Sequence, residues 1–313
     1  MTHMAEEERP LELMRLIEEA EGSRVISALR TLSWSLYTFD GNVQELDQVI
    51  QELEGPQGLM LAALENRDLL DATQRELARL LHNVVSAAKS LVDHTRILSR
   101  DLYARDSTRG DDYQARINDD FKTDPLSQFV NGLRQYCLHY RLPFIGFTLS
   151  FSRTGPGFDT SQTFFLNKES LQGFDWTASA RAYLEQCPDR IEFHSVMNDY
   201  QQKVHELYEW FWADIQDLYQ DELDRLRELE DEYSILELRA QLAFWDLDLE
   251  MSDAERVDNL FMTVLETGEL AQIREVAEPR HRLEAAMEVL DARLTLPEDL
   301  RAQLLDLLPD SSS

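Results

Sequence analysis

A long amphipathic segment in the first third of the chain decides the fold. It is Asp71–Tyr103, and it reads DATQRELARLLHNVVSAAKSLVDHTRILSRDLY. Residues suited to a protein core recur in it at steps of three and four, the spacing that brings side chains onto one face of an α-helix. They are Leu77, Leu81, Val84, Val85, Ala88, Leu91, Thr95, Leu98 and Leu102. The segment therefore predicts one long helix, capped by Asp71 or Thr73 and buried along one face.

The composition of the whole chain favours helices as well. Glycine and proline, which weaken or break helices, number 11 and 9 among 313 residues, and neither occurs between Pro188 and Gly268. The first predicted helical stretch begins at Pro10, which suits a first helical turn, and reaches about Leu53. We therefore expect a mainly α protein, a multi-helix bundle with an inserted β-hairpin and one long acidic helix that breaks near Trp210–Trp212.

In the middle of the chain, the spacing of apolar residues changes from steps of three and four to simple alternation. Phe144–Ser152 and Thr160–Leu166 alternate between apolar and polar residues and are rich in residues that favour strands. The turn-rich link Arg153–Asp159 lies between them. We expect a β-hairpin that a third strand can extend. It must pack on helices, because a lone hairpin is marginally stable in water.

Turn and capping residues mark further boundaries. Gly55–Gly58 predicts a break between helices. Asp124 and Pro125 predict the cap and first turn of a new helix, which must end before the next proline. Upstream of that helix, residues 106–124 contain few large apolar side chains, so we expect a loop there with a short helix over residues 113–121.

These boundaries divide the chain into five segments. The segments are N-terminal helices over residues 1–58, a helical core over 59–142, the β-hairpin and its connection over 143–188, the long helix over 189–250 and a C-terminal helical segment over 251–313. In the last segment, caps at Ser252 and Pro297 predict three or four short helices before a disordered tail.

Charge is distributed unevenly along the chain. The chain carries 60 acidic and 30 basic residues, a formal charge of −30, which repels nucleic acid and anionic membrane surfaces and favours a basic partner. Residues 71–141, however, hold 11 basic and 10 acidic residues. An anionic ligand is accommodated most readily in this near-neutral segment.

The sequence predicts a cytoplasmic protein that does not associate with membranes. The first residues are polar and acidic rather than basic and then apolar, and no apolar run approaches the roughly 20 residues that span a bilayer. Cys137 and Cys187 are too few for a disulfide framework and lack the spacing of metal ligands, which suits a reducing compartment.

One helix of the near-neutral segment carries two groups suited to phosphate chemistry. Its residues are Asn131-Gly132-Leu133-Arg134-Gln135-Tyr136-Cys137-Leu138-His139. Arg134 is always charged and can grip two phosphate oxygens, whereas His139 carries an imidazole, a side chain suited to proton transfer. Cleavage of RNA by its own 2′-hydroxyl needs both functions and does not need a metal.

The pair of Arg134 and His139, with four residues between them, resembles the signature of the HEPN superfamily. These are helical domains that include metal-independent ribonucleases of toxin and phage-defence systems. The resemblance extends from Thr73 to His139, and Gln135 stands where Asn, Asp or His is more usual. The wider pattern, with the hairpin, also looks like an uncharacterised group of bacterial proteins.

The resemblance implies a HEPN-like core over residues 59–142, catalytic roles for Arg134 and His139, and no cofactor. It also implies a homodimer, because in that family the catalytic site is assembled across two copies. RNA and a protein partner or antitoxin are then the candidate partners. The implied activity is that of an RNA endonuclease.

Helix geometry limits what this pair can do alone. Five residues of an α-helix advance by about 500°, which leaves Arg134 and His139 about 140° apart around a straight helix. Asn131 shares a face with Arg134, and Gln135 shares a face with His139. We therefore expect these polar groups to form two edges of a groove.

The long helix over Asp71–Tyr103 can support a phosphate contact. Its polar stripe is His82, Ser86, Lys89, Asp93, Arg96 and Arg100. If this helix packs antiparallel to the motif helix, Lys89 or Arg96 supplies a further cation. The alternative is a solvated face with local ion pairs, such as that between Asp93 and Arg96.

Three other interpretations remain open. In the first, Arg134 and His139 flank a buried helix and pair with acidic side chains and a backbone carbonyl. In the second, the chain is a non-catalytic interaction protein that holds a partner with its acidic long helix and with an aromatic cluster that we otherwise expect in the core. The cluster is Tyr200, Tyr208, Trp210, Phe211, Trp212 and Tyr219. In the third, carboxylates spaced like phosphates make the chain a DNA mimic.

Overall fold

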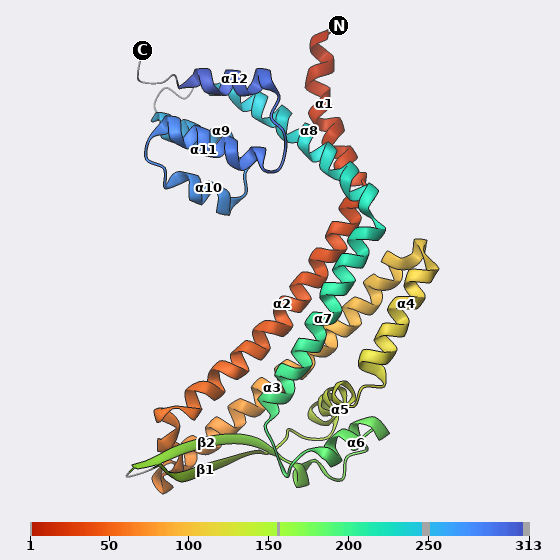
Figure 1. The fold of residues 1–313 in the computed structure, drawn as a ribbon, viewed down its shortest axis with the longest axis vertical. Coiled ribbons are helices and arrows are strands. Elements are labelled where there is room, and N and C mark those ends of the chain that lie inside the picture. The colour runs from red at the N-terminus through yellow and green to blue at the C-terminus, as the bar shows by residue number, and fades with distance from the viewer. Residues whose placement is uncertain (1, 155–156, 246–250, 309–313) are drawn as a thin grey trace. The chain divides into compact units, whose positions relative to one another are not determined.

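The computed structural model describes residues 2–154, 157–245 and 251–308 (Figure 1). Among these residues the chain forms 12 α-helices and one three-stranded antiparallel sheet, which confirms the mainly α fold with an inserted hairpin. The helices are α1 (Thr2–Glu19), α2 (Glu21–Glu54), α3 (Arg67–Leu102), α4 (Ser107–Ile117), α5 (Pro125–His139), α6 (Ala178–Gln186), α7 (Phe193–Leu218), α8 (Gln220–Phe244), α9 (Asp253–Phe261), α10 (Thr267–Arg274), α11 (Pro279–Asp291) and α12 (Glu298–Leu307). None of these helices is long and apolar enough to cross a membrane.

The chain divides into two compact units. The central unit is residues 26–218, which contain most of α2, then α3 to α7 and the sheet. The terminal unit combines the described parts of residues 1–25 and 219–313, which contain α1, the start of α2 and α8 to α12. The motif helix predicted from the sequence is α5, so the candidate site belongs to the central unit.

Three helices of the central unit, α2, α3 and α7, run side by side (Figure 1). The Ser35 hydroxyl of α2 and Nδ1 of His94 in α3 are 2.7 Å apart, and Nε2 of His205 in α7 lies 2.8 Å from the Asp40 carboxylate of α2. The predicted stripe of α3 is buried except for Leu98, which is half-buried. The amphipathic pattern therefore identified the core face of α3.

The start of α3 differs from the prediction, because the helix begins at Arg67. Asp71 and Thr73 are therefore not its caps. The Thr73 hydroxyl donates to the carbonyl of Leu69 at 2.9 Å, and the Asp71 carboxylate lies 2.8 Å from the Arg75 guanidinium. Both side chains therefore contact groups one turn away within α3, and the helix extends N-terminal to them.

The segment over residues 106–124, expected to be a loop with a short helix over residues 113–121, is helical for most of its length. α4 forms its first part, and a π-helical turn over Asn118–Lys122 forms its second. The Asp106 carboxylate caps α4 by accepting two hydrogen bonds from backbone amides of its first turn, at 3.0 and 3.1 Å. Tyr113 is buried and stacks on Trp210 of α7, with ring centroids 6.5 Å apart. The lack of an apolar stripe predicted a loop here, but in the structure the buried ring of Tyr113 anchors the helix.

The long acidic helix predicted over residues 189–250 is two helices, α7 and α8, and the break lies at Tyr219 rather than near Trp210–Trp212. The aromatic side chains pack inward and hold α7 helical across that stretch. Phe211 is 1% exposed and lies edge-on to Tyr103, with centroids 5.9 Å apart. The buried members of the aromatic cluster are Tyr200, Tyr208, Phe211 and Tyr219. Their burial confirms the expectation that these four belong to the core.

The predicted β-hairpin is present, formed by β1 (Ile145–Thr154) and β2 (Gly157–Asn167). Ile145 lies opposite Leu166 in the antiparallel register, and the short strand β3 (Arg190–Ile191) pairs with the other edge of β2. The side-chain amide of Gln74 in α3 donates to the Ile145 carbonyl at 2.5 Å. The hairpin is therefore tied to the helices at its base.

In the terminal unit, α9 to α12 and the end of α8 enclose an apolar core of their own. Leu238 of α8 and Phe261 of α9 are fully buried in it. Ser252 caps α9 in a capping box, and Pro297 immediately precedes α12. The four short helices and both predicted caps are thus confirmed, whereas the tail over residues 311–313 lies outside the described residues.

The close contact between α5 and Trp176, which lies just before α6, leads to a testable prediction about stability. A Cβ atom on Gly132 would lie 2.7 Å from two ring carbons of the buried Trp176, so Gly132→Ala should lower the free energy of unfolding by about 1–3 kcal/mol through overpacking. Gly41 in α2 is the matched control, because a Cβ there would meet no atom within 4 Å. Gly41→Ala should raise stability by about 0.5–1 kcal/mol. Urea denaturation would measure both, and a Gly132→Ala variant as stable as the wild type would contradict this account.

Candidate functional site

The first turn of α5 is fixed by its cap. The Asp124 carboxylate accepts hydrogen bonds from the backbone amide and the hydroxyl of Ser127, both at 2.8 Å, and Pro125 occupies the first turn as predicted. Nζ of Lys203 in α7 lies 3.3 Å from the same carboxylate. The start of α5 is therefore held both by its own sequence and by α7.

One face of α5 is buried against α6 and the segment before it. The ring of Phe129 stacks on Trp176 at 5.4 Å, and the ring of Tyr136 stacks on the same indole at 6.1 Å. Cys137 is also buried, and burial raises the pKa of its thiol to about 12, so this cysteine is not a nucleophile near neutral pH. The polar residues of α5 are left on its remaining surface.

A cavity of about 290 Å³ lies between α3, α5, α7 and the π-helical turn that follows α4. Its cationic side chains are Lys89 of α3, Lys122 of the π-helical turn and Arg134 of α5, and Asn131 adds an amide. The rest of the lining is mostly apolar. No carboxylate is among the described residues that line this cavity. In a chain with a formal charge of −30, this cavity is a local site of positive charge.

Two of the three cations are free to bind an anion. Neither the Arg134 guanidinium nor the Lys122 ammonium forms a hydrogen bond or ion pair with any residue that the structure describes. The Lys89 ammonium, in contrast, contacts the Asp93 carboxylate, which also lies 3.6 Å from Arg96. Because an arginine can donate to two oxygens at once, Arg134 is the strongest candidate for a phosphate contact.

The cavity contains some of the residues predicted from the sequence and not others. It brings together Asn131, Arg134 and Lys89, whereas Arg96 lines a neighbouring cavity. Gln135 is half-buried outside the cavity lining. His139 is exposed at the last residue of α5 and does not line the cavity either, so one chain does not join the arginine and the histidine.

Exposed apolar side chains surround His139 in the sequence. Leu138, Tyr140, Leu142 and Phe144 are 39%, 50%, 55% and 61% exposed. Nearby, the Arg141 guanidinium donates to the Ser170 carbonyl at 2.7 Å and to the Tyr136 hydroxyl at 2.6 Å. We call Leu138, Tyr140, Leu142 and Phe144 the His139 patch. Exposed apolar side chains concentrated in this way are typical of protein interfaces.

Sequence reasoning missed Lys122 and Tyr200, which also line the cavity. Lys122 comes two residues before the Asp124 cap, which places it near the start of α5. Its position in one cavity with residues of α3 could not be inferred, because the conformation of the segment before the cap was not predicted in full. Tyr200 reaches the cavity from α7, and a contact so distant in sequence left no local signal.

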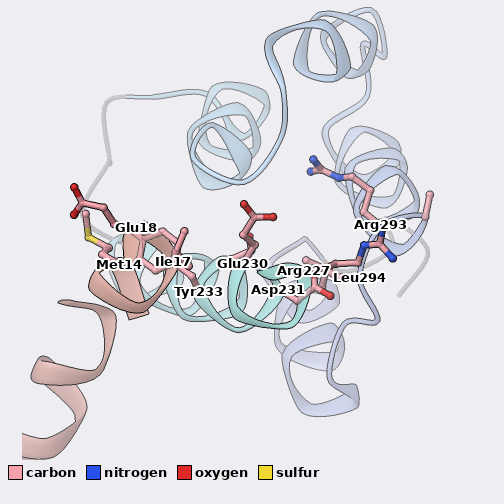
Figure 2. A pocket seen from close by; sticks show the side chains of 11 residues that line it. Met14, Ile17, Glu18, Arg227, Glu230, Asp231, Tyr233, Arg293 and Leu294 are labelled. Carbon is pink, nitrogen blue, oxygen red and sulfur yellow. The ribbon is translucent and has the colours of Figure 1, made fainter. Parts of the chain in front are cut away.

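The terminal unit has a larger groove of about 870 Å³ between α1, α8 and the residues that follow α11 (Figure 2). It presents the carboxyl groups of Glu18, Glu230 and Asp231. Burial raises the pKa of Glu230 and of Asp231 above their ordinary values. Arg293 at its edge is held 3.4 Å from Glu269. Arg227 also lines this groove, and no predicted site residue lies in it.

Comparisons with known proteins add no further assignment. No family model matches the chain, and no curated protein and no solved structure matches it. The interpretation of the site therefore depends on the chemistry and geometry of its own residues.

The Asp124 cap of α5 leads to a prediction about how the stability of the fold depends on pH. Burial raises the pKa of Asp124, but the hydrogen bonds from Ser127 and the charge of Lys203 outweigh it and leave the pKa below its ordinary value of 3.8. The carboxylate therefore stabilises the fold fully above the unfolded-state pKa, and this stabilisation is lost as the pH falls through the lower folded-state pKa. Asp124→Ala should cost about 1–2 kcal/mol at neutral pH.

The difference between wild type and Asp124→Ala, measured by urea unfolding, should shrink as the pH is lowered below about 4. Asp124→Asn is the control, because it keeps a cap acceptor without the charge and should cost less at neutral pH. A cost of Asp124→Ala that is the same at neutral and at strongly acidic pH would rule out a charged cap.

Proposed function

We propose that the chain is a metal-independent endoribonuclease that binds an RNA phosphate in the cavity beside α5. The observation that carries the proposal is the set of three cations, without a carboxylate, in the cavity of a strongly acidic chain. An RNA phosphodiester is an anion that such a cavity would stabilise, and the apolar walls would exclude water from it. The spacing of Arg134 and His139, which resembles the HEPN signature, supports the same class of reaction.

Each polar group has a role in this proposal. Arg134 would donate to two phosphate oxygens and stabilise the charge that develops on them, and Lys122 would neutralise that charge further. The 2′-hydroxyl of the ribose would attack the adjacent phosphorus as a base removes its proton. The bond to the 5′-oxygen would break, and that oxygen would receive a proton. His139 is the candidate for proton transfer, because an imidazole titrates near neutral pH.

The proposal requires two copies of the chain. His139 does not line the cavity that contains Arg134 of the same chain. A dimer with its two-fold axis near the His139 patch would bury the four apolar side chains of the patch. It would also bring the imidazole of one copy toward the cavity of the other. The exposure of Phe144 and Leu142, at 61% and 55%, supports this location for a dimer interface.

Cleavage of RNA in the presence of EDTA tests the activity. We expect His139→Ala and Arg134→Gln each to lower the cleavage rate by roughly 100-fold or more, because each removes a separate requirement of the transition state. His281→Ala is the matched control, since His281 lies in the terminal unit with its side chain 71% exposed. Equal rates for wild type and His139→Ala would reject the catalytic role. If the wild type neither bound nor cleaved RNA, the non-catalytic interaction protein would become the better interpretation.

Mixing the two inactive variants tests whether the site is shared. In a heterodimer of Arg134→Gln with His139→Ala, one composite site lacks both groups and the other has both. After exchange of subunits, the mixture should therefore recover roughly a quarter of the wild-type activity. A double variant carrying both substitutions in one chain, mixed with wild type, is the control for exchange. No recovery in the mixture, with exchange demonstrated, would show that the two residues do not act across a dimer.

A further inference from the structure

A second cavity, of about 160 Å³, adjoins the cationic cavity. The two cavities share four lining residues, Val92, Ile117, Phe121 and Tyr200. Phe121 and Tyr200 meet edge to face, with ring centroids 6.2 Å apart. A ligand held by Arg134 in the first cavity therefore has a second space directly beside it.

The second cavity is lined mainly by apolar side chains. Its polar lining residues include Arg96 and Gln114, both of which are exposed. Leu91, Val204 and Leu207 line it, and each is buried. The Thr95 hydroxyl donates to the Leu91 carbonyl at 2.7 Å and contacts the Tyr208 hydroxyl, so these two hydroxyl groups are already used. Among the buried lining residues, a nucleobase would leave its polar edge without partners, whereas an aliphatic chain would not.

The two cavities thus differ in polarity, since the buried lining of the second is mainly apolar. Arg134 and Lys122 lie in the first and suit an anionic head group, while the second suits a short apolar chain. The two cavities are on the same face of α3, because Val92 contributes to both. One ligand with an anionic head and an apolar tail would satisfy both cavities at once.

We propose that the paired cavities bind a small free anion with an aliphatic tail, such as an alkyl phosphate, and that this ligand displaces RNA phosphate from Arg134. The inference rests on the phosphate-binding part of the proposed function but not on catalysis. It adds a small-molecule inhibitor to the candidate ribonuclease. A free anion is favoured over a membrane lipid, because the second cavity has room for a short chain and not for two long ones.

Calorimetric titration of the full-length protein with inorganic phosphate, methyl phosphate, butyl phosphate and hexyl phosphate tests the proposal. Affinity should rise roughly fourfold for each methylene group that enters the second cavity and should then level off. Hexyl phosphate that binds no more tightly than methyl phosphate would overturn the inference. This series uses the wild-type chain and does not depend on the folding of any variant.

Two variants assign the effect to the cavities. Leu207 lines the second cavity but not the first, so Leu207→Trp should fill the second cavity and abolish the dependence on chain length while inorganic phosphate still binds. Arg134→Gln should weaken every phosphate ligand at least tenfold. Unfolding curves should show that both variants are folded. If the dependence on chain length persists unchanged in folded Leu207→Trp, the tail binds elsewhere and the proposal is wrong.

Further measurements separate this inference from the ribonuclease. Hexyl phosphate should inhibit RNA cleavage competitively, and vesicles of phosphatidylcholine and phosphatidic acid should not bind. Binding to vesicles without a response to hexyl phosphate would overturn the choice of a free anion. If RNA is not cleaved but affinity still rises with chain length, the ribonuclease is rejected and the ligand site stands. If RNA is cleaved but chain length has no effect, the ligand site alone is rejected.

Discussion

The packing of α5 on Trp176 is the constraint on which the candidate site depends. Gly132 allows the indole to approach the helix closely, and Phe129 and Tyr136 stack on the same ring system. Once this face is buried, the period of the helix leaves Asn131 and Arg134 on the surface that α3 partly covers. The position of the phosphate-binding groups is therefore determined by apolar packing on the opposite side of the same helix.

Charge explains why this location is suited to an anion. The chain as a whole has twice as many acidic as basic residues, yet the described lining of the cavity contains three cations and no carboxylate. Acidic side chains are concentrated elsewhere, among them Glu230 and Asp231 of α8, where burial raises their pKa. An anionic ligand would be repelled by much of the surface at long range and stabilised once it reached Arg134.

The sequence allowed the prediction of elements whose signal is local. The apolar stripe of α3, the Asp124 cap and the alternation in β1 and β2 each lie within a few residues of the structure that they specify. α4 was predicted only in part, because its anchor is the stacking of Tyr113 on Trp210, a pair almost 100 residues apart. The same limit hid Lys122, which could be placed at the cavity only after α4 and its π-helical turn were known. The geometry of a helix did predict that Arg134 and His139 do not share a face of α5.

A crystal structure of the protein with an RNA dinucleotide blocked by 2′-O-methylation would show whether the cavity binds an RNA phosphate, because the blocked RNA can bind but not react. We expect the phosphate within hydrogen-bonding distance of Arg134 and Lys122, with His139 of a second copy beside the bridging oxygen. RNA bound away from this cavity, or a phosphate in the cavity with neither copy's His139 near it, would rule out the proposed composite site.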